Sequence, residues 1–119
     1  MISGADSFLD VHRRAGHDNL YCCLDVIHSA FHREDIPIAI EKLGDRLLVC
    51  QFCDAIPGQM THYPPGEGSM DLGAILRTLT KISFKNFLMI EIYKGGDTPK
   101  DIADKQYAGA METITRELG

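Results

Sequence analysis

The stretch LYCCLDVI, from Leu20 to Ile27, decides the fold class of this chain. It is apolar over almost the whole length of a strand, which is typical of a strand covered on both faces and unlike a half-exposed antiparallel strand. Two runs of the same kind follow, LLVCQFC from Leu47 to Cys53 and FLMIEI from Phe87 to Ile92. Together the three runs predict a buried parallel sheet.

Helical patterns precede and separate these strands, at Asp6–Ala15, Ile36–Leu43, Asp71–Lys81 and Pro99–Leu118. Gly16, Gly44 and the Gly95-Gly96 pair mark breaks, and Asp54–Met70 is predicted to be a loop because Pro and Gly are dense there. The fold class is therefore α/β, with a helix followed by three strand–helix units joined as parallel crossovers. The expected inner face of the last helix comprises Ile102, Tyr107, Ala110, Met111, Ile114 and Leu118.

Composition restricts the function classes. The 119 residues, 45% hydrophobic and 24% charged, suit a single globular domain, residues 1–119. The net charge of -5 and the lack of a dense Lys/Arg cluster argue against nucleic acid and an anionic membrane surface as partners, and favour a cation or a neutral metabolite. No apolar run reaches membrane-spanning length and no signal sequence is visible, so we expect a cytoplasmic protein.

The four cysteines are expected to be reduced thiols that are buried as small hydrophobes. Cys50 and Cys53 have CxxC spacing, and Cys22 is adjacent to Cys23. All four lie in strand-like runs rather than in the tight turns of zinc sites, and strand alternation sends Cys22 and Cys23 to opposite faces.

Each predicted strand has a polar residue of metal-ligand type near its end: Asp25, Gln51 and Glu91. The C-terminal ends of neighbouring parallel strands form one active face, so these side chains are expected to converge. Their oxygen atoms suit Mg²⁺ or Mn²⁺. The simpler alternative is that each residue only caps a strand or binds the following loop.

Further polar residues lie close to these strand ends. His28 follows Asp25 by three residues and is a candidate substrate ligand or acid/base group, or else a surface histidine. His62 and Glu67 belong to the turn-rich segment His62–Gly68, which either contributes to the pocket or is a solvated turn. Asp54 either orients the ligands or caps the loop.

The succession LDVIH (24–28), VCQFCDA (49–55), PPGEGSMDLGAILRTL (64–79) and FLMIEIY (87–93) resembles the C-terminal half of the xylose isomerase-like (β/α)8 barrels. That group contains sugar phosphate isomerases/epimerases, sugar 3-epimerases, inosose dehydratase and 3-dehydroshikimate dehydratase. The resemblance extends from about Ser7 to Glu117 and implies a partial TIM barrel of about three β/α units.

The resemblance also implies a divalent metal (Mn²⁺ or Mg²⁺, with Co²⁺ and Zn²⁺ as further candidates) held by Asp25, Gln51 and Glu91. The resemblance gives His28 a substrate contact, and Glu91 and His28 are the expected catalytic residues. His62 and Glu67 are further candidate substrate contacts because of their position in the loop. The implied substrate is a small sugar or polyol, which loses a proton next to a metal-bound carbonyl. Gln51 stands where epimerases usually have His and resembles the dehydratase branch, so a lyase that dehydrates a cyclic polyol ketone is the alternative.

Two features of a complete member are missing from this sequence. Such a barrel has eight strands and typically about 250 residues, and the family's earlier Glu ligand has no counterpart upstream of Asp25, where the acidic residues are Asp6, Asp10 and Asp18. Self-association or a missing N-terminal part is therefore expected to complete the barrel, and a non-catalytic remnant is a further alternative. DNA-repair endonucleases that share the barrel use additional His ligands and a basic surface, neither of which is visible here.

Overall fold

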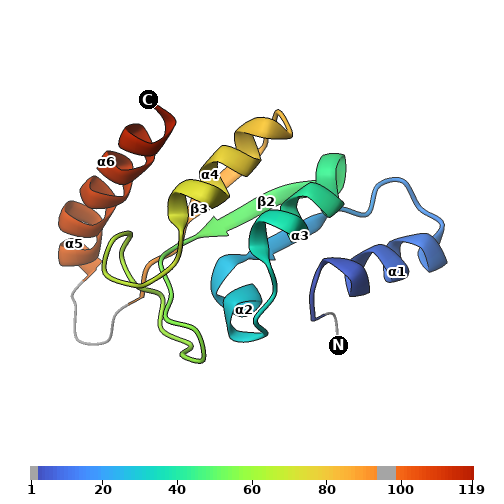
Figure 1. Cartoon of the computed structure of the whole chain (residues 1–119), viewed down its shortest axis with the longest axis horizontal. Helices are drawn as coiled ribbons and strands as arrows, with labels where there is room; N and C mark the ends of the chain where they lie inside the picture. The colour runs from blue at the N-terminus through green and yellow to red at the C-terminus, as the bar shows by residue number, and fades with distance from the viewer. Residues whose placement is uncertain (1–2, 94–98) are drawn as a thin grey trace.

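The computed structural model describes residues 3–93 and 99–119, in which three parallel strands form one sheet in the order β1, β2, β3 (Figure 1). The strands are β1 (Cys22–Asp25), β2 (Leu47–Phe52) and β3 (Phe87–Ile90). The predicted α/β class and the parallel order of the strands are confirmed. The predicted break at Gly95-Gly96 lies outside the described residues.

The helices pack side by side along the sheet. In Figure 1, α3 and α4 lie across β2, with α1 next to α3 and α6 next to α4. None of the helices in the described part of the chain is long and apolar enough to cross a bilayer. The helices are α1 (Ala5–Ala15), α2 (Val26–Phe31), α3 (Ile36–Leu43), α4 (Leu72–Lys81), α5 (Pro99–Asp101) and α6 (Tyr107–Leu118), with a 3₁₀ turn at Gly44–Arg46 and a π-helical segment at Ile102–Gln106.

The two faces of the sheet differ in burial because side chains alternate along each strand. Leu24, Cys50 and Phe52 share the face under the helices and are at most 4% exposed. On the opposite face, Phe87 is 66% exposed and Met89 is 43% exposed. We call this second surface the open face; Asp25 and Gln51 lie on it at the ends of their strands.

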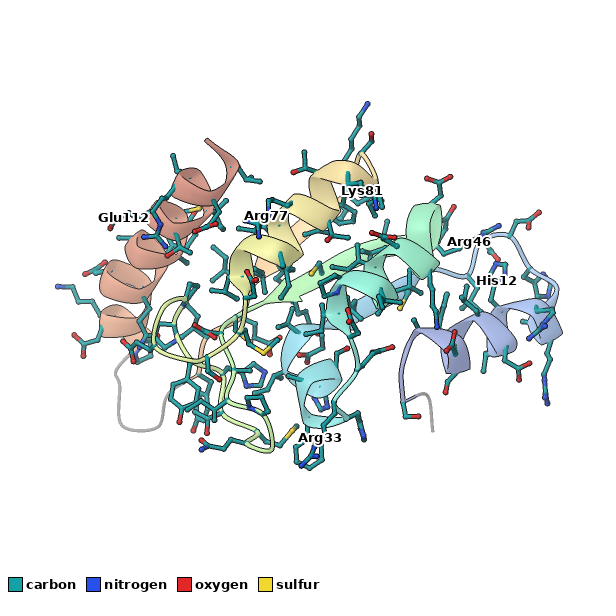
Figure 2. The ribbon with its side chains drawn as sticks, in the orientation of Figure 1. His12, Arg33, Arg46, Arg77, Lys81 and Glu112 are labelled. Carbon is teal, nitrogen blue, oxygen red and sulfur yellow. The ribbon has the colours of Figure 1, made fainter. Side chains whose placement is uncertain are left out.

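Exposed ion pairs connect neighbouring helices on the outer surface. Lys81 Nζ of α4 lies 2.7 Å from Glu41 Oε1 of α3, and Arg77 Nη1 of α4 lies 3.5 Å from Glu117 Oε2 of α6 (Figure 2). Pairs as exposed as these contribute at most about 1 kcal/mol each, so the buried apolar contacts beneath them provide most of the stability.

The predicted strand from Leu20 to Ile27 was too long. The strand covers only Cys22–Asp25, and Val26 and Ile27 begin the short helix α2, which was not predicted. Both residues are fully buried, so their apolar character fits a buried helix turn as well as a strand. Asp25 ends the strand because its side chain caps α2 by accepting hydrogen bonds from the N–H groups of Ile27 and His28.

The predicted helix at Pro99–Leu118 is divided by the π-helical segment, and most of its expected inner face was wrong. Ala110 is buried and Ile114 is partly buried, but Tyr107, Met111 and Leu118 are 55%, 39% and 51% exposed. Thr113 is buried in their place. All of these residues lie in α6, after the π segment, and its buried residues are Ala110 and Thr113, so the buried stripe of α6 is narrower than the apolar spacing predicted. The side chain of Ile102 lies outside the described part.

Ser83 ends α4 in a conformation that favours glycine. Its φ is 55°, and the N–H groups of Ser83 and Phe84 donate to the carbonyls of Thr80 and Leu79, as in a Schellman motif. Ser83→Gly is therefore expected to raise the free energy of unfolding by about 0.5 to 1 kcal/mol in urea denaturation, because it relieves the left-handed strain of a side-chain-bearing residue. Ser83→Ala keeps Cβ and is expected to give no gain; an equal gain from both variants would contradict this explanation.

Candidate metal centre

The ends of the three strands bring the predicted ligands to one edge of the sheet. Asp25 and Gln51 are direct partners in the pairing of β1 with β2. Glu91 comes immediately after β3, and its backbone N–H donates to Phe52 O at 3.1 Å. Gln51 is partly buried and lies between the two strands that carry the carboxylates.

Asp25, His62 and Glu91 form a compact cluster on this edge. Each offers one ligand atom, and these atoms all lie within 4.8 Å of one another. His62 Nε2 is 4.0 Å from Glu91 Oε1, and all three residues are partly buried. Two carboxylates and an imidazole at this spacing are a donor set that a divalent cation can bridge.

One carboxylate oxygen supports this interpretation. Glu91 Oε2 is buried and has no hydrogen-bond partner in the described structure. A buried carboxylate oxygen without a donor is unfavourable, and such atoms in native proteins commonly indicate an ion or a water. The donor set therefore fits a divalent metal ion.

His28 lies beside Asp25. Its Nε2 is 3.5 Å from Asp25 Oδ2, and its side chain is 59% exposed. Asp25 Oδ1 already accepts two backbone N–H groups from α2, which fixes the carboxylate and leaves Oδ2 on the side of His28. Asp25 is thus a helix cap as well as a candidate ligand.

A cavity of about 540 Å³ opens next to this edge, along the free side of β1. Its lining combines ionisable and amide side chains with thiols and small residues. The residues of chemical interest are Asp25, His28, His32, Gln51, Cys22 and Cys23. The cavity is large enough for a small metabolite.

Residues 54–70, which we call the His62 loop, form no helix or strand, as predicted, but isolated backbone pairing holds the loop at its start and in its middle. Asp54 and Tyr63 exchange two backbone hydrogen bonds of 2.8 and 3.0 Å. Tyr93 N–H donates to His62 O at 3.1 Å, which brings the loop against the segment that follows β3.

The structure separates the two loop residues that the sequence suggested for the site. His62 lies with Asp25 and Glu91 in the cluster. Glu67 is exposed in a turn whose N–H donates to Pro64 O, and it does not join that group among the described residues. From the sequence, His62 was predicted to be a substrate contact. Its proximity to Asp25 and Glu91 arises because the loop folds back toward the strand ends, and no local sequence pattern predicts that path.

The four cysteines are free thiols, and the expected burial holds for Cys50 and Cys53. Cys22 is half-buried, and Cys23 is exposed, which corrects the prediction for that residue. Cys23 lies on the open face, where no described helix covers it. Burial raises the pKa of Cys22 to about 11 and those of Cys50 and Cys53 to about 12, and nearby thiol and carboxylate groups contribute further.

Thiol labelling checks this arrangement. At pH 8 the native chain is expected to react with Ellman's reagent first at Cys23, because that thiol is exposed although partial burial and nearby carboxylates raise its pKa, while Cys50 and Cys53 stay protected because they are buried and protonated. All four thiols should react after unfolding in guanidinium. The fast phase should disappear in Cys23→Ser; its persistence in that variant would show that another cysteine is accessible.

Comparison with known proteins identifies the fold family. A family model described as "Xylose isomerase-like TIM barrel" matches residues 2–115. The chain belongs to this family. Fructoselysine 3-epimerase from Escherichia coli O157:H7 is 27% identical to the chain over 73 residues, a match that covers 61% of this chain and 26% of that protein.

Solved structures of the same barrel superpose on nearly the whole chain. An L-ribulose 3-epimerase has a TM-score of 0.77 at 19% identity, covering 98% of this chain and 42% of that chain. A xylose isomerase domain protein from Planctomyces limnophilus has a TM-score of 0.76 at 23% identity, covering 98% and 44%. The chain thus spans less than half the length of these barrels, and its sheet corresponds to part of one.

Proposed function

We propose that this chain carries part of the active site of a metal-dependent sugar isomerase/epimerase, in which a proton is removed next to a carbonyl. The observation that carries the proposal is the cluster of Asp25, His62 and Glu91, whose ligand atoms lie within 4.8 Å, together with the buried and unpartnered Glu91 Oε2. The family match supports the same reading, because several structural relatives are sugar 3-epimerases.

Asp25, Gln51 and Glu91 are the proposed metal ligands, with His62 close enough to join them. Mn²⁺ and Mg²⁺ suit the oxygen donors, and an imidazole nitrogen shifts the preference toward Mn²⁺, Co²⁺ or Zn²⁺. When bound, such a cation polarises a carbonyl and acidifies the adjacent C–H bond.

The side chains of the site supply the remaining chemistry. Glu91 is the proposed base, since a carboxylate of the cluster can accept the proton that leaves the carbon next to the carbonyl. His28, next to the cavity, is placed to donate a hydrogen bond to a substrate hydroxyl or to exchange a proton with it. His62 and Glu67 are proposed as substrate contacts from the loop, with Glu67 requiring a movement of its turn.

A lyase reaction is the second candidate, and Gln51 is the residue that favours it. Gln51 lies near the end of β2, the strand between the two that carry Asp25 and Glu91. By the resemblance to the family, epimerases usually have His at this position and the dehydratase branch has Gln. Both reactions would begin with the same proton abstraction by Glu91. They differ in the next step, because an isomerase/epimerase returns a proton to another face or carbon, whereas a lyase expels a β-hydroxyl as water.

Completion of the barrel is the proposed role of a partner. The open face exposes Phe87 and Met89, and no other strand of residues 3–93 and 99–119 pairs with the edge of β1 beside the cavity. A second copy of this chain or an N-terminal part of the barrel would cover these surfaces and supply a further carboxylate across the site.

Hydrogen–deuterium exchange at the substrate tests the proposed chemistry. The Mn²⁺-loaded chain in D₂O is expected to introduce deuterium next to the carbonyl of at least one ketohexose, or of inosose or dehydroshikimate, as followed by NMR. Enone absorbance would appear only if the reaction is a dehydration. Metal-loaded protein that exchanges none of these substrates would contradict the proposal for this chain and favour a non-catalytic remnant.

A further inference from the structure

Asp54 is a buried carboxylate with an unusual number of backbone partners. It is 2% exposed, and its two oxygens accept four backbone N–H groups. The donors are Ala55 at 2.8 Å, Gly66 at 2.9 Å, Gly68 at 3.0 Å and Met70 at 3.1 Å. Hydrogen bonds to a carboxylate are stronger than neutral ones, so this side chain organises the far half of the His62 loop.

The loop sequence is matched to that carboxylate. Gly66 has a φ of +93°, in the region that favours glycine. At Gly68 an added Cβ would collide with the Asp54 carboxylate and approach Ala55 N to 2.8 Å. Gly66 and Gly68 therefore allow the backbone to come close enough to donate to Asp54.

The same residue also fixes the near half of the loop. The backbone of Asp54 exchanges two hydrogen bonds with Tyr63, the neighbour of His62. The loop then continues to the bond between His62 O and Tyr93 N, two residues beyond Glu91. Asp54 thus connects the end of β2 to the residues that follow His62, the histidine that lies 4.0 Å from Glu91.

From this geometry we propose that Asp54 is a positioning residue that holds His62 in place for binding at the metal centre. Asp54 does not belong to the Asp25, His62 and Glu91 cluster, so its effect is exerted through the loop backbone. A loop held in its binding conformation avoids an ordering penalty when a ligand arrives. This inference rests on the proposed function, because it concerns the ligand set of that site.

A double-mutant cycle on Mn²⁺ affinity, measured by electron paramagnetic resonance with Mn²⁺ alone, tests the proposal. Asp54→Asn keeps the shape but places an amide NH₂ against backbone donors, and is expected to weaken Mn²⁺ binding about 10- to 100-fold, as for other groups that orient metal ligands. Adding His62→Ala to Asp54→Asn should cause little further loss. Additive losses from the two changes would overturn the proposal, because a purely structural role predicts additivity.

Control variants separate positioning from general destabilisation. Asp71→Asn makes the same acid-to-amide change at the carboxylate that caps α4 just beyond the loop, and is expected to leave Mn²⁺ affinity unchanged. If Asp54→Asn does not fold, Asp54→Glu keeps the charge while displacing the carboxylate, and is expected to show the same non-additivity with His62→Ala.

The metal-free protein provides an independent readout. The imidazole NMR signals of His62 are expected to be those of one ordered ring in the wild type, and to move toward random-coil positions in Asp54→Asn. Unchanged His62 signals would refute the positioning role. If the wild type binds no Mn²⁺, the proposed function fails, but the NMR comparison still decides the role of Asp54.

Discussion

Glu91→Gln is expected to lower the affinity of the chain for Mn²⁺ by about 100-fold or more. Changes to groups that only orient metal ligands already reduce affinity about 10- to 100-fold, and this change removes the charge of a ligand itself. Glu91 Oε2 is buried without a hydrogen-bond partner in the described structure, which leaves this oxygen available to a cation. Equilibrium dialysis or electron paramagnetic resonance of free Mn²⁺ measures the effect.

The matched control is Glu112→Gln, which makes the same change on the exposed surface of α6 at a residue outside the cluster (Figure 2). It is expected to leave Mn²⁺ affinity unchanged. The fold should survive Glu91→Gln, since the backbone bond from Glu91 N–H to Phe52 O does not involve the side chain. Equal Mn²⁺ retention in Glu91→Gln and the wild type would exclude Glu91 as a ligand.

Phe52→Ala is expected to give the largest loss of stability, about 3 to 5 kcal/mol in urea denaturation. Phe52 is fully buried at the end of β2, on the face that packs under the helices, and the truncation leaves a cavity that its neighbours fill only in part. Phe52 is the last residue of β2 and follows Gln51, so its packing also holds the strand end at the site. Near the urea concentration at which half of the variant is unfolded, Phe52→Ala should therefore bind Mn²⁺ more weakly than the wild type.

Phe87→Ala is the matched comparison, because the same side chain there is 66% exposed on the open face. A loss of about 0.5 kcal/mol or less is expected for the isolated chain. A loss as large as that of Phe52→Ala would show that the open face is buried in solution. Dependence of that loss on protein concentration would identify self-association as the cause.

The sequence was sufficient to predict the sheet and the edge at which Asp25, Gln51 and Glu91 meet. Continuous apolar runs identified the three strands, and polar residues at their ends identified the edge at which they meet. Asp25 and Gln51 are paired in register there, and Glu91 follows on the next strand. These features are local in sequence, so pattern and spacing reveal them.

Other features depend on contacts between distant segments. His62 reaches Glu91 through a loop whose path is set by Asp54, and no periodicity encodes that return. The helix α2 was missed because Val26 and Ile27 are apolar in either conformation; Asp25, as a capping residue two positions before Ile27, was the available signal. The exposure of Cys23 follows from the uncovered face, which the strand pattern predicted to be buried.

The central claim is that a divalent cation binds among Asp25, His62 and Glu91. Anomalous diffraction tests this claim most directly. Crystals of the chain grown with Mn²⁺ and measured at the manganese absorption edge are predicted to show an anomalous difference peak within about 2.5 Å of a carboxylate oxygen of both Asp25 and Glu91. An ordered Asp25, His62 and Glu91 cluster with no peak between them, in crystals that contain Mn²⁺ elsewhere, would contradict the account.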